Sequence, residues 1–200
     1  MEDTKNVETC VMDKDDYVVL LMDDPEFDSN AVKYIASLMA NPNIDITIDK
    51  LKEFNNDQLA IIEAVFSAVD KIKVTDEQKA IFLNNSFNAT QLNLLWQGIT
   101  QGVSEEDIKL LADPSIPYGV LNYVIQGLIK GYPMIKYAKG YNIGQVYEIF
   151  NAFANDVTEE QIRTVEDLDD GLIAVATRAF VAGKEVIRNE QDEEISLIIK

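Results

Sequence analysis

The sequence of 200 residues contains no histidine and a single cysteine, Cys10. The lack of histidine excludes Ser–His and Cys–His nucleophile pairs, histidine-ligated metal sites and the usual proton carrier near neutral pH. One cysteine can form neither an internal disulfide nor a thiolate metal cluster. Of the common catalytic chemistries, only those that need carboxylates alone remain.

Long apolar runs are also missing, since none approaches the ~20 residues that a membrane-spanning helix requires. The first ten residues, MEDTKNVETC, are acidic and polar, unlike the basic and apolar parts of a signal peptide. We therefore expect a cytoplasmic protein with no cofactor and no metal ion. With 47% apolar residues, the chain is expected to bury a sizeable core.

Basic residues are scarce: 17 Lys and Arg stand against 35 Asp and Glu, which gives a net charge of −18. The acids concentrate toward both ends, whereas residues 121–150 carry three lysines and one glutamate. Such a charge repels nucleic acid and anionic membranes and attracts basic partners. Solubility alone is the other explanation of this charge.

A phrase of the form aromatic–Asn–x–x–Gln–apolar occurs three times, as FNNDQL at 54–59, FNATQL at 87–92 and YNIGQV at 141–146. Asn is a good N-cap, Gln three residues later closes a capping box, and the flanking apolar residues form a hydrophobic staple. Each phrase therefore predicts the start of a helix. The predicted N-caps are Asn55, Asn88 and Asn142.

Weaker copies of the phrase begin at Phe27 (FDSNAV), Ile116 (IPYGVL) and Leu168 (LDDGLI). The six starts then fall at 27, 54, 87, 116, 141 and 168, a degenerate repeat of roughly 27 residues. A second helix start follows in the clearer units, at Thr75, Ser104 and Thr158. Gly102 and Gly131 lie between the two helices, where a left-handed helix stop favours glycine.

Each unit is thus predicted to be a helix of about three turns, a tight turn and a shorter helix. One such hairpin cannot bury its apolar face alone, so neighbours must stack. The small residues at one equivalent position predict a close helix–helix crossing. These residues are Gly98, Gly127, Ala152 and Ala179.

We predict an all-α fold of about a dozen helices, with six units over residues 27–188 stacked as a short α-solenoid or a compact helical array. Residues 1–26 are predicted to form an acidic N-terminal cap, in which YVVLLM is a short helix or strand. Residues 189–200 are predicted to be a charged stop followed by an apolar tail that covers the last unit. The fourth unit, with Pro117, Pro133 and no Asn–Gln box, is expected to be an irregular joint between Ile116 and Tyr141.

The units FNATQLNLLWQG and YNIGQVYEIFNAF resemble a phrase, aromatic–x–x–x–Gln–apolar–x–x–apolar–x–x–Gly, found in tandem in proteins of bacterial mobile elements and phages. The resemblance covers roughly residues 27–188. The fourth and sixth units depart from it because they lack the Gln and the aromatic residue. The resemblance implies a small helical accessory protein, with anti-CRISPR-like anti-defence inhibitors among the candidates, and it supplies no catalytic residues.

Two dense acidic clusters are the first candidate for partner binding, because surface carboxylates can approximate the charge density of nucleic-acid phosphates. Solvated helix starts, favoured by the helix dipole, are the alternative. A metal site is a third reading, although no Asp-x-Asp-x-Asp-Gly loop is present. The clusters are Glu166, Asp167, Asp169 and Asp170, and Glu190, Asp192, Glu193 and Glu194.

Tyr118, Tyr132 and Tyr137 are the second candidate for partner binding, since they lie near predicted turns and tyrosine is common in binding hot spots. No Gly-rich phosphate loop is present, and nothing selects a catalytic pair of carboxylates. We therefore expect a non-enzymatic acidic protein that inhibits a basic, nucleic-acid-handling partner such as a nuclease, without binding nucleic acid or membrane itself. A structural adaptor in a larger assembly is the alternative, and binding that is insensitive to salt would favour it.

Overall fold

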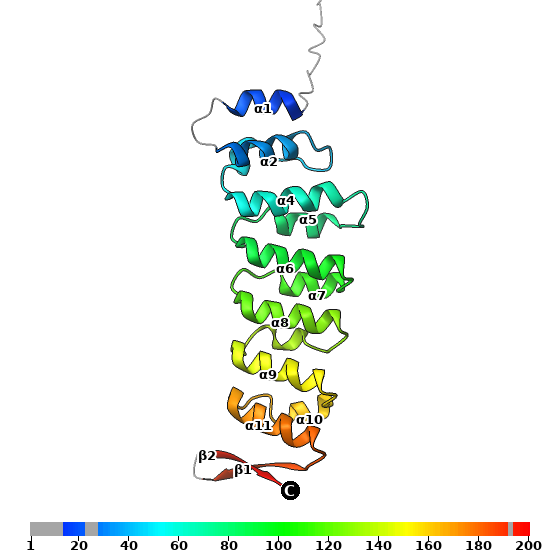
Figure 1. Cartoon of the computed structure of the whole chain (residues 1–200), viewed down its shortest axis with the longest axis vertical. Coiled ribbons are helices and arrows are strands. Elements are labelled where there is room, and N and C mark those ends of the chain that lie inside the picture. The colour runs from blue at the N-terminus through cyan, green and yellow to red at the C-terminus, as the bar shows by residue number, and fades with distance from the viewer. Residues whose placement is uncertain (1–13, 23–27, 192–193) are drawn as a thin grey trace, which may run out of the picture. The chain divides into compact units, whose positions relative to one another are not determined.

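The computed structural model describes residues 14–22, 28–191 and 194–200, and this part of the chain is mostly helical (Figure 1). It contains eleven α-helices, one 3-10 helix and a two-stranded sheet. The prediction of a helical protein is therefore confirmed, apart from the two strands. The chain divides between Ala89 and Thr90 into two compact units, which are described separately.

The described part of unit 1 contains five helices, and both α2 and α5 contact α4. The longest helices, α2 and α4, lie against each other, and α1 packs on α2. Their buried faces carry aliphatic side chains and Phe66. The helices are α1 (Lys14–Met22), α2 (Ser29–Met39), α3 (Ile48–Leu51), α4 (Asn56–Ala68) and α5 (Asp76–Phe82).

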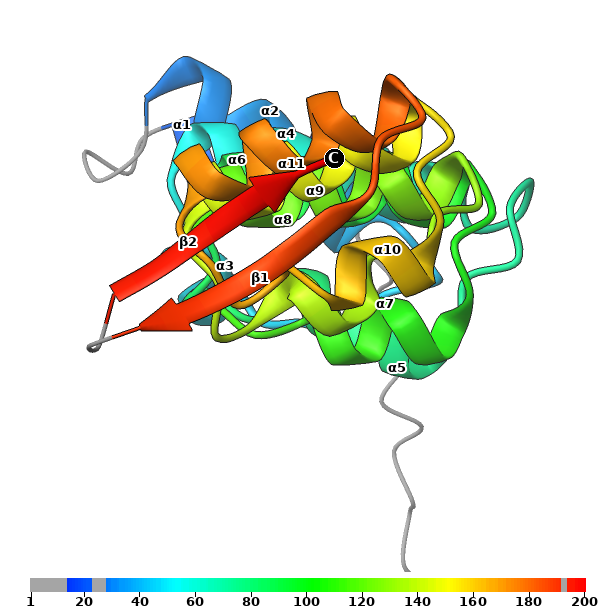
Figure 2. The same ribbon diagram turned by 90° about the horizontal axis from the view of Figure 1, so that it is seen from below.

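Unit 2 contains longer helices that alternate with shorter ones and a hairpin that follows them. In Figures 1 and 2, α6, α8, α9 and α11 form one layer, while α7 and α10 belong to a second layer. The elements are α6 (Ala89–Thr100), α7 (Glu105–Leu111), α8 (Tyr118–Ile129), the 3-10 helix η1 (Ile135–Ala138), α9 (Ile143–Ala154), α10 (Glu159–Arg163), α11 (Asp170–Val181), β1 (Val186–Gln191) and β2 (Glu194–Ile199).

Helices begin where the capping phrases predict. Asn55 and Asn142 cap α4 and α9 with complete capping boxes, and Asn88 immediately precedes α6. Complete boxes also start α5 at Thr75 and α10 at Thr158. Ser104 accepts a backbone N–H at the start of α7. In the weaker copies that begin at Phe27 and Leu168, the second residues, Asp28 and Asp169, accept backbone N–H groups at the starts of α2 and α11.

The glutamine of the phrase has a second function that the sequence pattern did not reveal. Besides closing its capping box, Gln58 donates from Nε2 to the carbonyl oxygen of Phe87 at 2.6 Å. Gln145 closes its own box and donates to the carbonyl oxygen of Leu168 at 2.7 Å. In both cases the acceptor is the first residue of the next predicted unit. One amide side chain thus caps its own helix and fixes the chain at the following start.

The longer helices of unit 2 also end alike. In each, a residue with positive φ follows the helix, and the next N–H donates to the carbonyl of the small residue five positions earlier, which is a Schellman motif. The positive-φ residues are Gly102, Gly131, Asp156 and Gly183. The small acceptors are Gly98, Gly127, Ala152 and Ala179, at 2.9, 2.9, 3.1 and 2.9 Å.

A close crossing at the small position is confirmed for both glycines. A Cβ atom on Gly127 would lie 2.3 Å from Met134 Cγ, and one on Gly98 would lie 2.9 Å from Ile108 Cδ1. Ile108 belongs to α7 and Met134 directly precedes η1, so a side chain at either glycine would push the following segment away.

The fourth predicted unit is irregular in one respect. Its second element is the four-residue 3-10 helix η1, where the flanking units have the α-helices α7 and α10. Pro133 stands where the preceding unit has the capping Ser104, and no side chain caps the start of η1. The expected joint between Ile116 and Tyr141 stays a prediction.

The charged stop and apolar tail predicted for residues 189–200 did not include strands, whereas β1 and β2 form an antiparallel hairpin there. The hairpin packs against α11, and Ile199 lines a hollow there with Val175 and Ala179. A short run such as SLII fits a helix or a strand equally well, so only the nonlocal pairing with β1 selects the strand. At the other end, YVVLLM is helical within α1, whereas residues 1–13 and Phe27 lie outside the described residues.

Candidate protein-binding surface

A row of aromatic rings runs across the neighbouring helices α8 and α9. Consecutive ring centroids lie 5.2 to 6.0 Å apart, within the range that favours tilted and edge-to-face contacts. The row starts on α9, crosses to α8 and back to α9, and includes the turn after α8. Its members, in order of contact, are Tyr147, Tyr123, Phe150, Tyr132 and Phe153.

The turn after α8 places Tyr132 in this row. Gly131 has a φ of 81°, and Tyr132 N donates to Gly127 O, so the chain reverses directly after the helix. Tyr132 then stacks on Phe153, with an interplanar angle of 21°, and meets the edge of Phe150. The left-handed residue is therefore what brings a loop tyrosine against α9.

The row is partly open to solvent. Tyr147 is 43% exposed, and Phe150, Tyr123 and Tyr132 are half-buried. At the starts of α8 and α9, Tyr118 and Ile143 are 63% and 53% exposed. Exposed apolar and aromatic side chains on neighbouring helices are typical of an interaction site. We call these residues the ring surface: Tyr118, Tyr123, Tyr132, Ile143, Tyr147 and Phe150.

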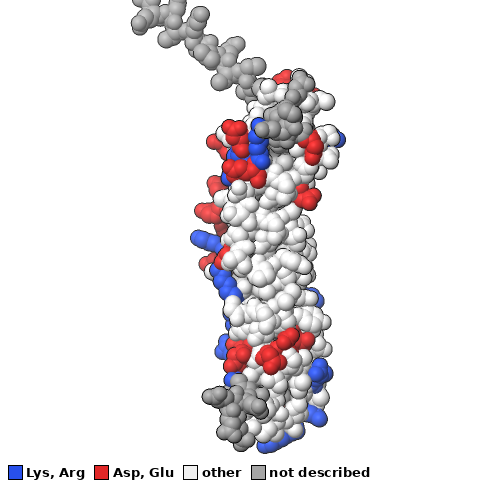
Figure 3. All heavy atoms as spheres, turned by 90° about the vertical axis from the view of Figure 1, so that its left-hand side faces the viewer, with Lys and Arg blue, Asp and Glu red and all other residues white. Residues whose placement is uncertain are grey.

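The ring surface lies in a part of unit 2 with few charges. Helices α6 and α8 contain no charged residue, and α9 contains only Glu148. Lys130 lies beside the rings, with its Nζ 5.4 Å from the centre of the Phe150 ring. In Figure 3 the ends of α6, α8 and α9 that face the viewer are mostly white, while acids gather beside the start of α11. Depletion of charge and enrichment of tyrosine are typical of the centre of a protein interface.

The structure separates the three tyrosines predicted from sequence. Tyr118 is exposed, and Tyr132 belongs to the row of aromatic rings on α8 and α9. Tyr137, in contrast, is 0% exposed, and its hydroxyl donates to the Glu166 carboxylate at 2.7 Å. Burial, followed by the bond to Glu166, raises the pKa of the Tyr137 phenol above its usual value. The prediction that Tyr137 is an accessible anchor is wrong, because Tyr137 is a core residue whose hydroxyl is bonded to Glu166.

The carboxylates of the first acidic cluster are largely paired within the protein. Glu166 accepts from Tyr137 and from Lys136 Nζ at 2.8 Å. Both Asp167 oxygens lie 2.8 Å from Arg188 Nη1. Asp169 caps α11 by accepting from Leu172 N at 2.9 Å, and Asp170 is exposed in the first turn of that helix. This cluster therefore presents less free negative charge than its composition indicates.

The second acidic cluster lies at one end of the hairpin. Glu190 belongs to β1 and Glu194 to β2, where Gln191 is the Cα partner of Glu194. Asp192 and Glu193 lie outside the described residues.

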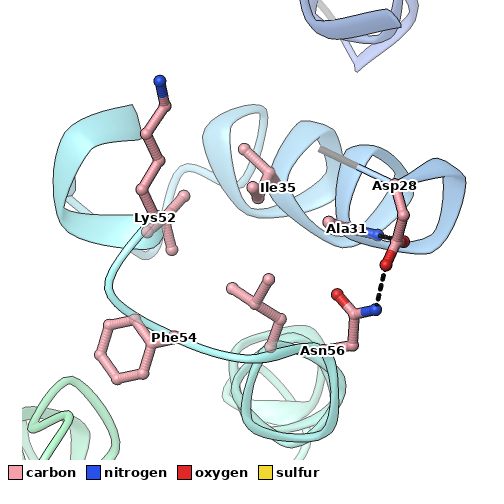
Figure 4. A pocket seen from close by; sticks show the side chains of 8 residues that line it. Asp28, Ala31, Ile35, Lys52, Phe54 and Asn56 are labelled. Atoms are coloured by element: carbon pink, nitrogen blue, oxygen red, sulfur yellow. Dashed lines mark hydrogen bonds between the residues drawn. The ribbon is translucent and has the colours of Figure 1, made fainter. Parts of the chain in front are cut away.

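A separate hollow of about 300 Å³ occurs in unit 1 (Figure 4). Apolar side chains such as Ile35 and Phe54 line much of it, and Lys52 points its amine away from it. The carboxylate of Asp28 accepts from Asn56 Nδ2 at 2.6 Å and from the N–H groups of α2. Its polar groups are thus used for holding α2 and α4 together.

Within the described part of the chain, no three His, Cys, Asp or Glu side chains are grouped so that they could hold a metal ion. None of the described helices is long and apolar enough to cross a membrane.

Sequence reasoning missed Ile143 and Tyr147 as surface residues. The apolar stripe of α9 consists of Val146, Ile149 and Phe153, which are buried. Tyr147 directly follows Val146 and therefore lies off this stripe, which was the available signal for an aromatic group on the surface.

No family model matches this chain, and no curated protein or solved structure is significantly similar to it.

Proposed function

We propose that this chain is a non-enzymatic protein-binding module, built as a short stack of helical hairpins that presents the ring surface to a partner. The observation that carries the proposal is the row of partly exposed rings on α8 and α9, in a region with almost no charged residues. Tyrosine supplies a large contact area with little loss of conformational entropy, and truncation of such anchors commonly costs most of the binding energy. The partner is a protein with a largely apolar patch of matching size.

The hairpin stack is supported by features that recur in register. The capping asparagines, the glutamine that bonds the next start, and the Schellman motif return at equivalent positions of successive units. Stacked repeats offer an extended surface that suits protein binding. Small-angle X-ray scattering tests the stack, because an α-solenoid of six units gives a larger maximum dimension than a compact globule of the same mass.

The central experiment compares two double variants in affinity capture from a host lysate, followed by affinity measurement with the purified partner. Ile143→Ser/Tyr147→Ser removes two exposed side chains of the ring surface. Leu110→Ser/Val181→Ser removes two other exposed apolar side chains, on α7 and α11, and is the matched control. We expect the first pair to weaken binding by more than about tenfold and the control by less than about twofold. Equal effects of the two pairs would contradict the proposal.

A second candidate function is inhibition of a basic, nucleic-acid-handling partner. The resemblance to accessory proteins of bacterial mobile elements and phages implies such an anti-defence function. The net charge of −18 favours it, together with acids in the first turns of the short helices. These acids include Asp76 and Glu77 of α5, Glu105 and Glu106 of α7, and Glu160 of α10.

The salt dependence of partner binding distinguishes the two candidate functions. Contacts between exposed charges weaken strongly as salt rises, because the Debye length falls from ~10 Å at 0.1 M to ~3 Å at 1 M. Binding through the ring surface should persist at ~1 M salt and be insensitive to Glu105→Lys/Glu106→Lys. Binding as a phosphate mimic should be lost under both conditions and survive Ile143→Ser/Tyr147→Ser.

A further inference from the structure

Among the described residues, no strand pairs with the outer edge of β2. Within the described residues the sheet contains only β1 and β2, in the register Val186↔Ile199 to Gln191↔Glu194. In the view from below, β2 forms one side of the hairpin and no described helix or strand runs alongside it in the plane of the sheet (Figure 2). Such an edge presents a row of N–H and C=O groups that can pair with another strand.

The hydrogen-bond pattern shows which residues present these groups. Glu185 and Lys200 exchange both backbone bonds, at 3.2 and 3.0 Å. Hydrogen-bonded and non-hydrogen-bonded pairs alternate along an antiparallel ladder. The backbone groups of every second residue of β2, counted from Lys200, therefore face β1. Those of Ile195, Leu197 and Ile199 face outward.

The sequence of β2 is complementary to itself in one antiparallel register. A two-fold axis at Leu197 pairs Leu197 with Leu197 and Ile195 with Ile199 of the other copy, so that the outward-facing backbone groups meet. The same register places Glu194 opposite Lys200 at both ends, and opposite charges across a strand pair are favourable.

We propose that this chain forms a two-fold symmetric dimer in which the β2 edges of two copies pair antiparallel, with Leu197 on the axis, to give a four-stranded sheet. Closed isologous pairing is the commonest way for a chain to use a self-complementary surface. It would also cover part of Ile198 and Ile199, which are 44% and 39% exposed in the single chain. This interface is separate from the ring surface and does not depend on the function proposed above.

The first experiment measures dimerisation of the full chain by sedimentation equilibrium over a dilution series. We expect a monomer–dimer equilibrium that Leu197→Pro weakens at least about tenfold, because proline removes one outward N–H from each copy on the axis. The N–H of residue 197 is not used within the hairpin, so β1–β2 pairing should persist. Leu197→Ala keeps the N–H and is the matched control, with a smaller effect expected.

The second experiment uses charge swaps that separate pairing between copies from effects within one hairpin. Copies with Glu194→Lys carry lysine at both positions, and copies with Lys200→Glu carry glutamate at both. Each variant alone places like charges opposite each other, whereas a mixed dimer pairs lysine with glutamate at both ends. Native mass spectrometry of an equimolar mixture should therefore show the heterodimer several-fold above its statistical share. Any effect within one hairpin is the same in the mixture and in the separate proteins.

A wild-type chain that remains monomeric over the dilution series would overturn the proposal. So would a dimer whose dissociation constant is unchanged by Leu197→Pro, or a mixture that forms the two homodimers and the heterodimer in statistical proportions. If β2 instead receives a strand from another protein, the isolated chain stays monomeric, which also rejects the second copy as occupant.

Discussion

The predicted repeats of this protein, which begin at residues 27, 54, 87, 116, 141 and 168, are joined in two chemically different ways. At three starts, the side-chain amide of Gln58, Gln91 or Gln145 donates to a backbone carbonyl of the following start. Around the fourth unit, which lacks the glutamine, the connections involve charged groups. These are Lys139 with Asp113 at 2.5 Å, and Lys136 and Tyr137 with Glu166.

The difference follows from burial. Gln58 and Gln91 are 5% and 4% exposed, so their amides replace water at carbonyl groups that would otherwise be unsatisfied. Lys139 and Asp113 keep 64% and 32% of their side-chain surface exposed. Exposed ion pairs contribute little to stability because water and salt screen them. The two kinds of connection should therefore respond differently to mutation, pH and salt.

The largest effect is expected for Gln91→Ala. Gln91 Nε2 donates to the carbonyls of Ile116 and Pro114 at 2.9 and 3.0 Å, and its loss leaves both acceptors without this donor. Leaving a buried acceptor unpaired costs about 1–3 kcal/mol, and the bond to Pro114 is only part-buried. We therefore expect the free energy of unfolding to fall by about 2–4 kcal/mol. Urea denaturation followed by circular dichroism measures it.

Gln161→Ala is the matched control for this prediction. Gln161 closes the capping box of α10, and the described structure shows no bond from it to a following start. Its loss should cost only about 0.5–1 kcal/mol. Equal losses for the two variants would show that the second bond of Gln91 contributes nothing.

Installing a glutamine in the fourth unit would test whether the amide connection can be transferred. Val120, which is 1% exposed, occupies the position equivalent to Gln91, and Pro117 occupies the position of the capping Asn88. Val120→Gln alone buries an amide without its capping partner and should cost about 1–3 kcal/mol. In Pro117→Asn/Val120→Gln, part of this loss should be recovered. Additive losses in the double-mutant cycle would mean that the amide connection needs more than the capping box.

The connection through Tyr137 should respond to alkaline pH. Its phenol has a pKa raised by burial and by Glu166, so folding favours the protonated form. This stabilisation is therefore complete below the pKa of the phenol in the unfolded chain, ~10, and is lost as the pH rises above it. We expect the urea midpoint to fall between pH 9 and pH 11, and to fall less in Tyr137→Phe.

In Tyr137→Phe the bond to Glu166 is lost, but Lys136 remains beside that carboxylate. The loss at neutral pH should therefore be about 1–2 kcal/mol. A variant whose alkaline response matches that of the wild type would assign the response to other tyrosines.

The smallest effect is expected at the exposed pair of Lys139 and Asp113. Hydrogen bonds from Lys139 and Ser115 hold the pKa of the Asp113 carboxyl below its usual range. This contribution is therefore present above the unfolded value of ~3.8 and is lost as the pH falls below it. Lys139→Ala should lower the urea midpoint slightly at low salt and not measurably at ~1 M salt. An undiminished effect at high salt would place this pair with the amide connections.

The helix starts could be predicted from the sequence because capping is local. An asparagine and a glutamine three residues apart satisfy N–H groups of the same turn, so Asn55 and Asn142 start helices without reference to the rest of the chain. The same holds for Gly131, since a left-handed residue after a helix is a local requirement. These features determined the helical class and the element boundaries.

Tertiary structure alone decided how the remaining groups are used. Tyr137 and Tyr147 have the same side chain, yet one is buried against Glu166 and the other is 43% exposed in the ring row. Glu166 and Asp167 form a dense acidic cluster in the sequence, whereas in the fold Lys136 and Arg188 pair with them. The strands β1 and β2 also depend on each other for their backbone partners. Burial, ion pairing and strand pairing join residues that are far apart in sequence, and for that reason local patterns determined the helices but not the exposed surface.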